Sequence, residues 1–519
     1  MAVAVEVADA ADAAPRIRAA DAILSSNSKS RLTTWGGFFV IPSPSLKVPA
    51  ATLRRMKLSF RIGALASALT LIPGCAVTPG GKDPTLTLPV AWRNAADFPT
   101  ASPDRDLTTW WSDFGDSQMS SLIRRAIAGN RDLASAMARV REAQARRDAQ
   151  KASLFPTLDY SGSRNAGKSW TDGGTDRSST SYSAGLSASW EADFFGRNRQ
   201  SILAASADAE AVKENLYSAQ AALASEVALA YLDLRAAEER LEIVKRSLTS
   251  REETTQLASW RAQAGEIDQL ELRQSESGLE SARSQLASLE QNISQTRNRL
   301  ALLCGQAPGT LSLKSGPIPS PARRLAVGIP ADTLRQRPDV RAAGYGWISA
   351  IARTRSAEAE RLPSLRLSGS LGIDTLKSSK LFNPESLATG IIAGISGPIF
   401  DAGRIRSNIE AQSAAEEQAL LAYQSAVLTA LSEVEDALIA CRLSAQRLAS
   451  LEKASAAAKE ASKLAGLKYR AGIIDITTVL DTQRSDLALE ESVAAVQADR
   501  AAAHVQLYKT LGGGWSAGS

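Results

Sequence analysis

The run from Arg404 to Arg470 decides the fold, and it reads RIRSNIEAQSAAEEQALLAYQSAVLTALSEVEDALIACRLSAQRLASLEKASAAAKEASKLAGLKYR. It has no proline and only one internal glycine, Gly466, so we expect one continuous helix. At 1.5 Å per residue such a helix would be about 100 Å long, which is more than a globular core requires. Apolar residues recur at every seventh position, the spacing of a coiled-coil seam, at Leu420, Val427, Val434, Cys441 and Leu448.

The long run is part of a unit that occurs twice, because the chain matches itself at a constant shift of 207 residues. Under this shift Gly196-Arg197 aligns with Gly403-Arg404, and Gly305 aligns with Gly512. We assign the two copies to residues 117–310 and 324–515. Each copy is predicted to run helix, strand, strand, long helix, turn, helix, with the first helix over residues 117–153. The predicted fold class is therefore mainly α with a small β part.

Two segments alternate between apolar and polar residues, as strands with one apolar and one polar face do. They are Tyr182 to Phe194 in the first copy and Leu365 to Asp374 in the second. Their length suits a tilted membrane strand, with Tyr182, Trp190 and Phe194 as interfacial aromatic residues, but it also suits a sheet packed on a soluble core. Only four strands are expected per chain, too few to close a barrel, so strands that crossed a membrane would have to share one between subunits.

An export signal is predicted at residues 56–74. Lys57 and Arg61 precede an apolar run from Ile62 to Ile72, which at about 11 residues is too short to span a bilayer. A signal does not work in the usual way deep inside a chain, so we expect translation to start at Met56. Residues 1–55 would then be an upstream extension without a fold.

Cys75 is the expected site of lipid attachment. The stretch Leu71-Ile72-Pro73-Gly74-Cys75 resembles a bacterial lipobox, which implies cleavage before Cys75 and acylation of its thiol. Pro73 departs from that pattern, and the alternative is a plain signal peptide with an incidental cysteine. Residues 75–116 would form the N-terminal lipoprotein segment.

Composition excludes several classes of function. The chain has 519 residues, 44% of them hydrophobic, and 60 Lys+Arg against 55 Asp+Glu, which describes an ordered protein without the concentrated basic field of a nucleic-acid binder. One histidine, His504, and three cysteines cannot build a zinc site of the usual spacing, so no metal site and no catalytic site is predicted. Cys304 and Cys441 should lie at different heights on their helices, too far apart for a disulfide, and we expect both of them to pack. We expect His504 to pack or to lie at the surface rather than to take part in chemistry.

Two matching turns are expected at the far ends of the long helices, at Arg261 to Asp268 and at Tyr469 to Asp475. Gly265 and Gly472 permit the positive φ that closes a helix, and Asp268 and Asp475 are placed to cap the next one.

These residues carry a resemblance to a family. The chain resembles TolC-like outer membrane efflux factors, in their lipoprotein branch, over about residues 75–515. The motifs are Trp110-Trp111 with Phe114-Gly115-Asp116, LRQRPDVRAA at 334–343, GPIFDAGR at 397–404, and Tyr469-Arg470-Ala471-Gly472. The resemblance implies a homotrimer in the cell outer membrane, with a twelve-stranded barrel and a periplasmic tunnel of long helical hairpins. It also implies a periplasmic adaptor protein and an inner-membrane pump as partners, no enzyme activity and no cofactor apart from the lipid.

The resemblance further implies a periplasmic gate at the second turn. Asp481 falls where the family places a ring of acidic side chains, and Tyr469 falls where a tyrosine helps to hold the aperture shut. Thr478 stands where some members have a second Asp, and Asp475 is the nearest substitute. The alternative for Asp481 is a solvated helix charge. Carboxylates that converge on an axis would attract cations.

The two turns are also the expected docking site for the adaptor, with small residues that allow close contact and arginines that bond to carbonyl oxygens. These residues are Arg261, Ala262, Gly265, Arg470, Ala471 and Gly472. Plain turn chemistry is the alternative for each glycine alone. A periplasmic helical scaffold without a pore and an autonomous diffusion porin remain the alternative functions, and the exported substrate is not readable from the sequence.

Overall fold

The computed structural model describes residues 88–96, 98, 107–170, 174, 177–321, 330–378 and 383–516. The chain divides into two units, Met1–Pro79 and Gly80–Ser519, and all described residues belong to the second. The predictions for residues 1–55, for the signal at 56–74 and for Cys75 therefore fall outside the described residues.

The described elements repeat in order, as the 207-residue shift predicts. The first copy holds α3 (Ser117–Gly129), α4 (Arg131–Lys151), β1 (Thr157–Ser169), β2 (Arg177–Ala192), α5 (Arg197–Gln263) and α6 (Gln269–Leu303). The second holds α7 (Pro330–Gln336), α8 (Pro338–Ala359), β3 (Ser364–Thr375), β4 (Leu387–Ser396), α9 (Arg404–Arg470) and α10 (Ile476–Thr510). Short 3-10 turns lie at Trp110–Phe114, Ala152–Leu154 and Pro384–Ser386.

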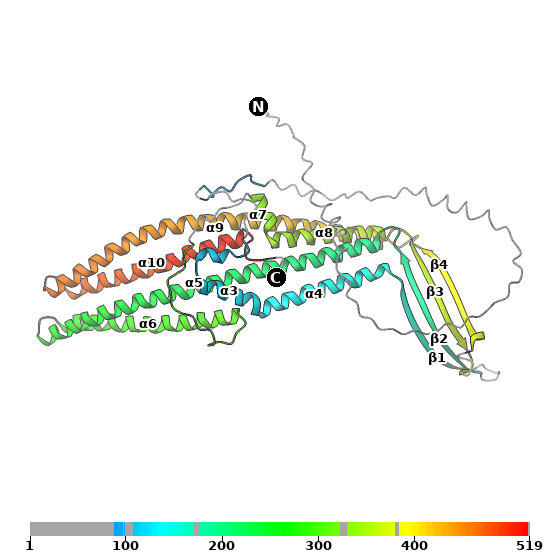
Figure 1. The fold of residues 1–519 in the computed structure, drawn as a ribbon, viewed down its shortest axis with the longest axis horizontal. Coiled ribbons are helices and arrows are strands. Elements are labelled where there is room, and N and C mark those ends of the chain that lie inside the picture. Colours follow the sequence, from blue (N-terminus) through cyan, green and yellow to red (C-terminus); the bar gives the residue numbers. More distant parts are fainter. Residues whose placement is uncertain are drawn as a thin grey trace, which may run out of the picture. The chain divides into compact units, whose positions relative to one another are not determined.

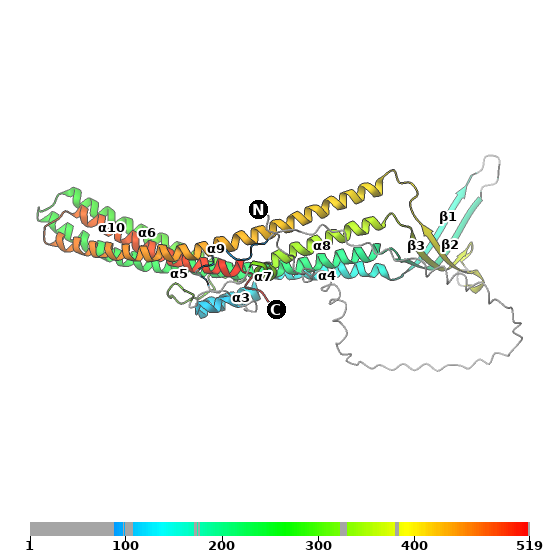
Figure 2. The ribbon, with the colours of Figure 1, turned by 90° about the horizontal axis from the view of Figure 1, so that it is seen from above.

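The long helices confirm the prediction made from the repeat. Helices α5 and α9 have 67 residues each, and α6 and α10 have 35 each. The four run side by side as two hairpins, with α5 against both α6 and α10 (Figures 1 and 2). None of the helices in the described ranges combines the length and the apolar character needed to cross a membrane.

The prediction of one helix over residues 117–153 is wrong, because the helix breaks at Asn130. This residue is extended, with ψ at 131°, and its side-chain oxygen accepts a hydrogen bond from the Leu133 amide at 2.9 Å, which starts α4 afresh. Its side-chain amide nitrogen, Nδ2, donates to the Leu303 carbonyl at 3.0 Å. The second copy breaks at the aligned residue, Arg337, which donates to the Thr510 carbonyl at 3.1 Å. The residues at the two breaks are 207 residues apart, and so are the residues whose carbonyl groups accept their hydrogen bonds.

The strands form one antiparallel sheet in the order β1-β2-β3-β4, with β2 of the first copy paired to β3 of the second. Apolar side chains of this sheet stay exposed rather than covered by a core, among them Leu158 (70%), Tyr160 (89%), Ile391 (84%) and Ile395 (76%). A sheet packed on a soluble core does not leave its apolar residues in this state. Because β1 and β4 lie at the edges, both keep one unpaired side.

The alternation predicted through Phe194 stops two residues earlier, because Asp193 turns the chain into α5. Its carboxylate accepts hydrogen bonds from the amides of Asn198 at 3.1 Å and Arg199 at 2.9 Å, and so caps the helix that follows. Phe194 therefore lies between strand and helix. Trp190 is in the strand and donates from its indole nitrogen to the Leu154 carbonyl at 2.9 Å.

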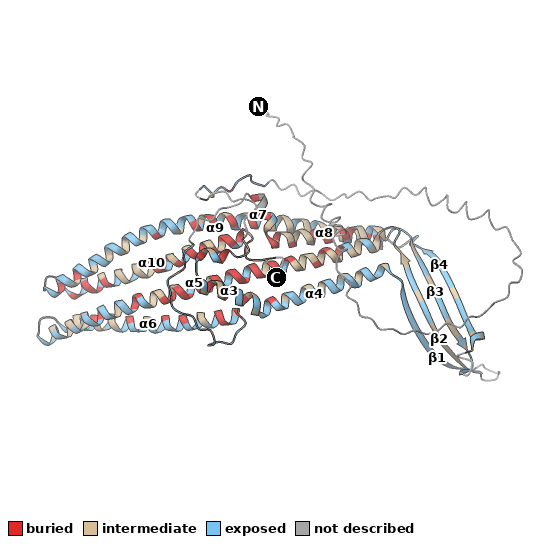
Figure 3. Ribbon diagram, in the orientation of Figure 1, coloured by how far each residue is buried: buried red, intermediate tan, exposed pale blue. Residues whose placement is uncertain are grey.

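The main core lies midway along the helices, where the 3-10 turn Trp110–Phe114 and α3 meet α5, α6, α9 and α10 (Figure 3). Trp110 stacks on Tyr508 with ring centroids 5.2 Å apart, and Tyr508 donates to the Asp113 carboxylate at 2.6 Å. Cys304 and Cys441 are buried in this core as free thiols, which confirms the prediction that both pack without a disulfide.

Candidate functional site at the hairpin tips

Each hairpin closes at a glycine with positive φ, as the sequence predicts. Gly265 has φ of 75° and Gly472 has φ of 72°. The amides that follow bond back into the helix, from Glu266 to the Arg261 carbonyl and from Ile473 to the Lys468 carbonyl, both at 2.9 Å. This six-to-one bond is the Schellman ending of a helix.

Aspartates begin the returning helices. The Asp268 carboxylate accepts from the Glu271 amide at 3.0 Å, and the Asp475 carboxylate accepts from the Thr478 amide at 3.0 Å. Asp475 also accepts from the Thr478 hydroxyl at 2.8 Å, and these bonds to the charged form lower the pKa of its carboxyl group. Thr478 thus supports Asp475 instead of supplying a second carboxylate.

A small core of its own holds the two tips together. Its buried members come from α5, α9 and α10, and they are Ala258, Ala465, Tyr469, Ile476, Val479 and Leu480. Tyr469, predicted at the gate, is only 2% exposed, and burial raises the pKa of its hydroxyl, although the nearby Arg261 opposes that shift. Tyr469 is therefore a neutral core residue of the tip at physiological pH.

Arg261 joins the first tip to the second. Its guanidinium carbon lies 4.8 Å from the centroid of the Tyr469 ring, and its Nη1 donates to the Tyr469 carbonyl at 3.1 Å. It also pairs with Glu266 at 3.2 Å. Arg470 is exposed and donates from Nε to the Gly466 carbonyl of its own helix at 3.3 Å. Both arginines bond to carbonyl groups of this chain, and of the two only Arg261 spans the two hairpins. Their predicted bonds to an adaptor stay a prediction.

Asp481 lies on α10, six residues beyond the Asp475 cap. Its side chain is 67% exposed and pairs with Arg484 of the next turn at 3.1 Å. The remaining predicted docking residues, Ala262, Gly265, Ala471 and Gly472, lie on or beside the turns. The structure thus brings Tyr469, Arg261 and the Asp475 turn together and leaves Asp481 on an exposed helix face.

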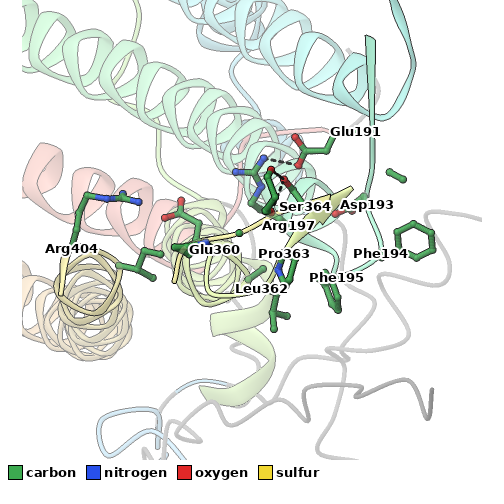
Figure 4. Close-up of a pocket in the computed structure, with 16 residues that line it drawn as sticks. Glu191, Asp193, Phe194, Phe195, Arg197, Glu360, Leu362, Pro363, Ser364 and Arg404 are labelled. Carbon is green, nitrogen blue, oxygen red and sulfur yellow. Dashed lines mark hydrogen bonds and ion pairs between the residues drawn. The ribbon is translucent and has the colours of Figure 1, made fainter. Parts of the chain in front are cut away.

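A cavity of 490 Å³ lies at the opposite ends of α5 and α9, where strands become helices. Arg197 donates there to Glu191 at 2.7 Å, and Figure 4 shows this bond. Exposed apolar residues surround the junction, namely Phe194, Phe195, Ile399 and Phe400. Phe194 was predicted among the interfacial aromatic residues, whereas sequence reasoning missed the other three because they lie outside the alternating segments.

Sequence reasoning also missed a buried polar network that fixes α3 to α5. Asp116 accepts from the Tyr231 hydroxyl at 2.8 Å, and that hydroxyl accepts from Arg235 at 2.7 Å. Arg235 pairs with Glu238 at 2.6 Å, which also accepts from Arg297 of α6. The Phe114-Gly115-Asp116 motif was the available signal, because an aspartate directly before a helical run suggests an N-cap.

The described ranges hold no cluster of three or more histidine, cysteine, aspartate or glutamate side chains suited to a metal. His504 donates a hydrogen bond from Nδ1 to the Arg500 carbonyl at 2.8 Å, and burial lowers the pKa of its ring. It packs in the last helix, as predicted.

Comparisons with known proteins agree with this geometry. The model of the outer membrane efflux protein family matches residues 122–306 and 329–513. The pyoverdine export outer membrane protein OpmQ of Pseudomonas aeruginosa is 33% identical, over 87% of this chain and 96% of that protein. The toluene efflux pump outer membrane protein TtgI of Pseudomonas putida is 31% identical, over 86% and 97%. The solved structure of the outer-membrane channel OprN matches with a TM-score of 0.78 and 31% identity, over 84% of this chain and 99% of that one.

Proposed function

We propose that this chain, which belongs to the outer membrane efflux protein family, forms a homotrimeric duct that carries small molecules out of the cell with its partner proteins. Family membership makes it an outer membrane efflux channel with a periplasmic helical part. The trimer, the partners, the gate and the lipid anchor are our proposals.

The main support for a trimer is the open four-stranded sheet of each chain. In lipid, the unpaired backbone groups of an edge strand each cost several kcal/mol, so β1 and β4 need partners. Three copies that pair β4 of one with β1 of the next close twelve strands, with the exposed apolar side chains toward lipid.

The helices offer a second surface for the same assembly. Helix α9 keeps a series of leucines roughly half exposed along its length, namely Leu421, Leu428, Leu443, Leu464 and Leu467. Apolar residues spread along a helix of 67 residues fit a neighbouring helix of another copy. The helices of three copies would then continue the barrel as a periplasmic tunnel.

The tips would carry the gate and the docking site. Tyr469 and Arg261 hold the two hairpins together, and Asp481 from three copies would place carboxylates around the axis as a cation-binding constriction. The exposed turns at Gly265 and Gly472 would receive a periplasmic adaptor protein, which links the duct to an inner-membrane pump. The duct itself is passive, with no enzyme activity and no cofactor, and a lipid on Cys75 would anchor it.

The substrate is proposed only as a class of small molecules. OpmQ is named for pyoverdine and TtgI for toluene, so relatives of similar identity differ widely in what they export. The specificity would then reside mainly in the pump.

Expression from Met56, separation of the membranes and an unheated gel with a palmitate label test this proposal. We expect an outer-membrane band at about three times the monomer mass that dissociates on heating and carries label. Cys75→Ser should lose the label and keep the trimer. A soluble periplasmic monomer would contradict the duct, and an unlabelled wild-type trimer would contradict only the anchor.

A further inference from the structure

A groove of 770 Å³ lies between α6 and α10 and begins beside Thr477 in the first turn of α10. Of the residues that line it, the proposed export uses only Asp481. Three arginines from three helices line it: Arg251 of α5, Arg273 of α6 and Arg484 of α10. Such a concentration of guanidinium groups in one hollow has to be balanced by charge of the opposite sign.

Arg251 is the unusual member. It is only 8% exposed, and in the described part of the chain no carboxylate lies within ion-pair distance of it. Its Nη1 donates to the Gly278 carbonyl at 3.3 Å, and its Nε donates to the Ser247 hydroxyl at 3.4 Å. Both bonds are long and both acceptors are neutral. A guanidinium has five N–H donors, so most of the hydrogen-bonding capacity of Arg251 remains available.

The carboxylates beside the other two arginines do not balance the charge of Arg251, because each is already paired with its own arginine. Arg273 pairs with Glu276 at 2.7 Å, and Arg484 pairs with Asp481 at 3.1 Å. Burial, and after it the positive charge of Arg484, lower the pKa of Arg251. The groove therefore holds one buried cation in excess of its acidic groups.

The wall opposite Arg251 is built from small residues of α6. A Cβ at Gly278 would lie 3.1 Å from the Arg251 Nη1, so glycine leaves room for the guanidinium there. Ser277 and Ser281, one helical turn apart, also line the groove and offer hydroxyl donors. The hollow thus combines a planar cation with neutral donors, and it has space for a small ligand.

We propose that this groove binds a small oxyanion, to which the Arg251 guanidinium donates through two N–H groups. Arg484, which is paired with Asp481, donates one of its remaining N–H groups to the same anion. Guanidinium matches carboxylate, phosphate and sulfate in the same bidentate geometry, so these groups share the required chemistry. A bound oxyanion would bridge α5 and α10 and would stabilise the arrangement of the helices just above the tips.

Equilibrium dialysis of the purified full-length protein with radiolabelled sulfate, at constant ionic strength, tests the site. We expect saturable binding of one sulfate per chain, and at least tenfold weaker binding to Arg251→Gln. Arg283→Gln is the matched control, because Arg283 is exposed on the same hairpin, pairs with Glu252 and Glu280, and does not line the groove. Competition by phosphate and by succinate then distinguishes a phosphoryl from a carboxylate ligand, and either supports the proposal.

A second measurement uses the wild type alone, in case Arg251→Gln does not fold. A crystal soaked in selenate should show an anomalous peak within hydrogen-bonding distance of Arg251. Absence of saturable sulfate, phosphate and succinate binding to the wild type, or equal binding to Arg251→Gln, would overturn the proposal. A selenate peak only at other arginines would overturn it as well.

Discussion

The guanidinium of Arg261 lies over the ring of Tyr469, 4.8 Å from its centroid, and also donates to the Tyr469 carbonyl at 3.1 Å. The two residues are on α5 and α9, so this contact crosses from the first repeat to the second. The cation–π interaction contributes about 0.5–1 kcal/mol and the hydrogen bond about 1 kcal/mol. A contact of this size biases the position of a helical tip without locking it.

Arg261→Gln should therefore loosen the tip and make the duct leak. The variant keeps a polar side chain of similar reach but loses the charge over the ring. We expect cells to become more sensitive to a glycopeptide antibiotic that ordinary porins exclude. Arg470→Gln is the matched control, because Arg470 bonds only within its own helix. Equal sensitivity of both variants would contradict the assigned difference between the two arginines.

Asp268 and Asp475 should act as equivalent helix caps. Replacing either by Ala removes a side-chain bond to the first turn and should cost about 1 kcal/mol, which corresponds to roughly fivefold faster amide exchange there. Hydrogen exchange of the first turns of α6 and α10 measures this. Asp475→Asn should keep the first turn of α10 protected from hydrogen exchange but should lose the negative charge. A change in channel conductance in this variant would therefore come from the lost charge and not from a lost cap.

Helix α9 could be predicted to the residue, and the reason is local. Helix α9 begins after Gly403 and ends before a glycine turn, and no proline interrupts it. The caps at Asp268 and Asp475 followed from spacing alone. Helix ends of this kind are set by glycine, proline and capping residues close by in the chain, so they can be predicted from the sequence alone.

Asp486 should destabilise the folded protein at neutral pH. It is half-buried on α10, and burial, together with Glu490, raises the pKa of its carboxyl group, while Lys459 opposes the shift. A raised folded pKa means that the folded state binds more protons, so stability falls as the pH rises from the ordinary value of 3.8 through the raised one.

Asp486→Asn should consequently have a higher midpoint of thermal unfolding at pH 7 than the wild type, and this advantage should shrink as the pH falls toward 4. The exposed Asp481 provides the comparison, because Asp481→Asn lacks the same burial. An advantage that is independent of pH would show that packing, rather than charge, explains the result.

Gly472→Trp should abolish export while the trimer reaches the outer membrane in normal amount. The bulky residue would block the proposed contact of the tip with an adaptor. Gly309→Trp is the control for backbone strain, because Gly309 also has positive φ but lies far from the tips in the sequence. A Cβ at Gly309 would meet open space, whereas one at Gly472 would lie 3.5 Å from Nη2 of Arg261. Drug resistance assays with blots for the trimer compare the two. If the Gly472→Trp variant kept drug resistance, the assignment of this tip to the adaptor-docking site would be wrong.

Other features needed the folded chain. The break at Asn130 was missed because the first copy has no proline there, although Pro338 marks the aligned helix start in the second copy. Arg251 looks in the sequence like any solvated arginine of a polar helix, and only the packing of α5 against α6 and α10 buries it. The exposure of the sheet likewise could not be read from alternation, which a soluble sheet shares.

Single-channel recording in planar bilayers tests the duct most directly. The account predicts stepwise, cation-selective currents from the purified wild-type protein, and larger, less selective steps from Asp481→Ala, because the carboxylates at the constriction are lost. Steps of unchanged size and selectivity in Asp481→Ala would contradict the gate assignment. Absence of current steps from both proteins would contradict the channel itself.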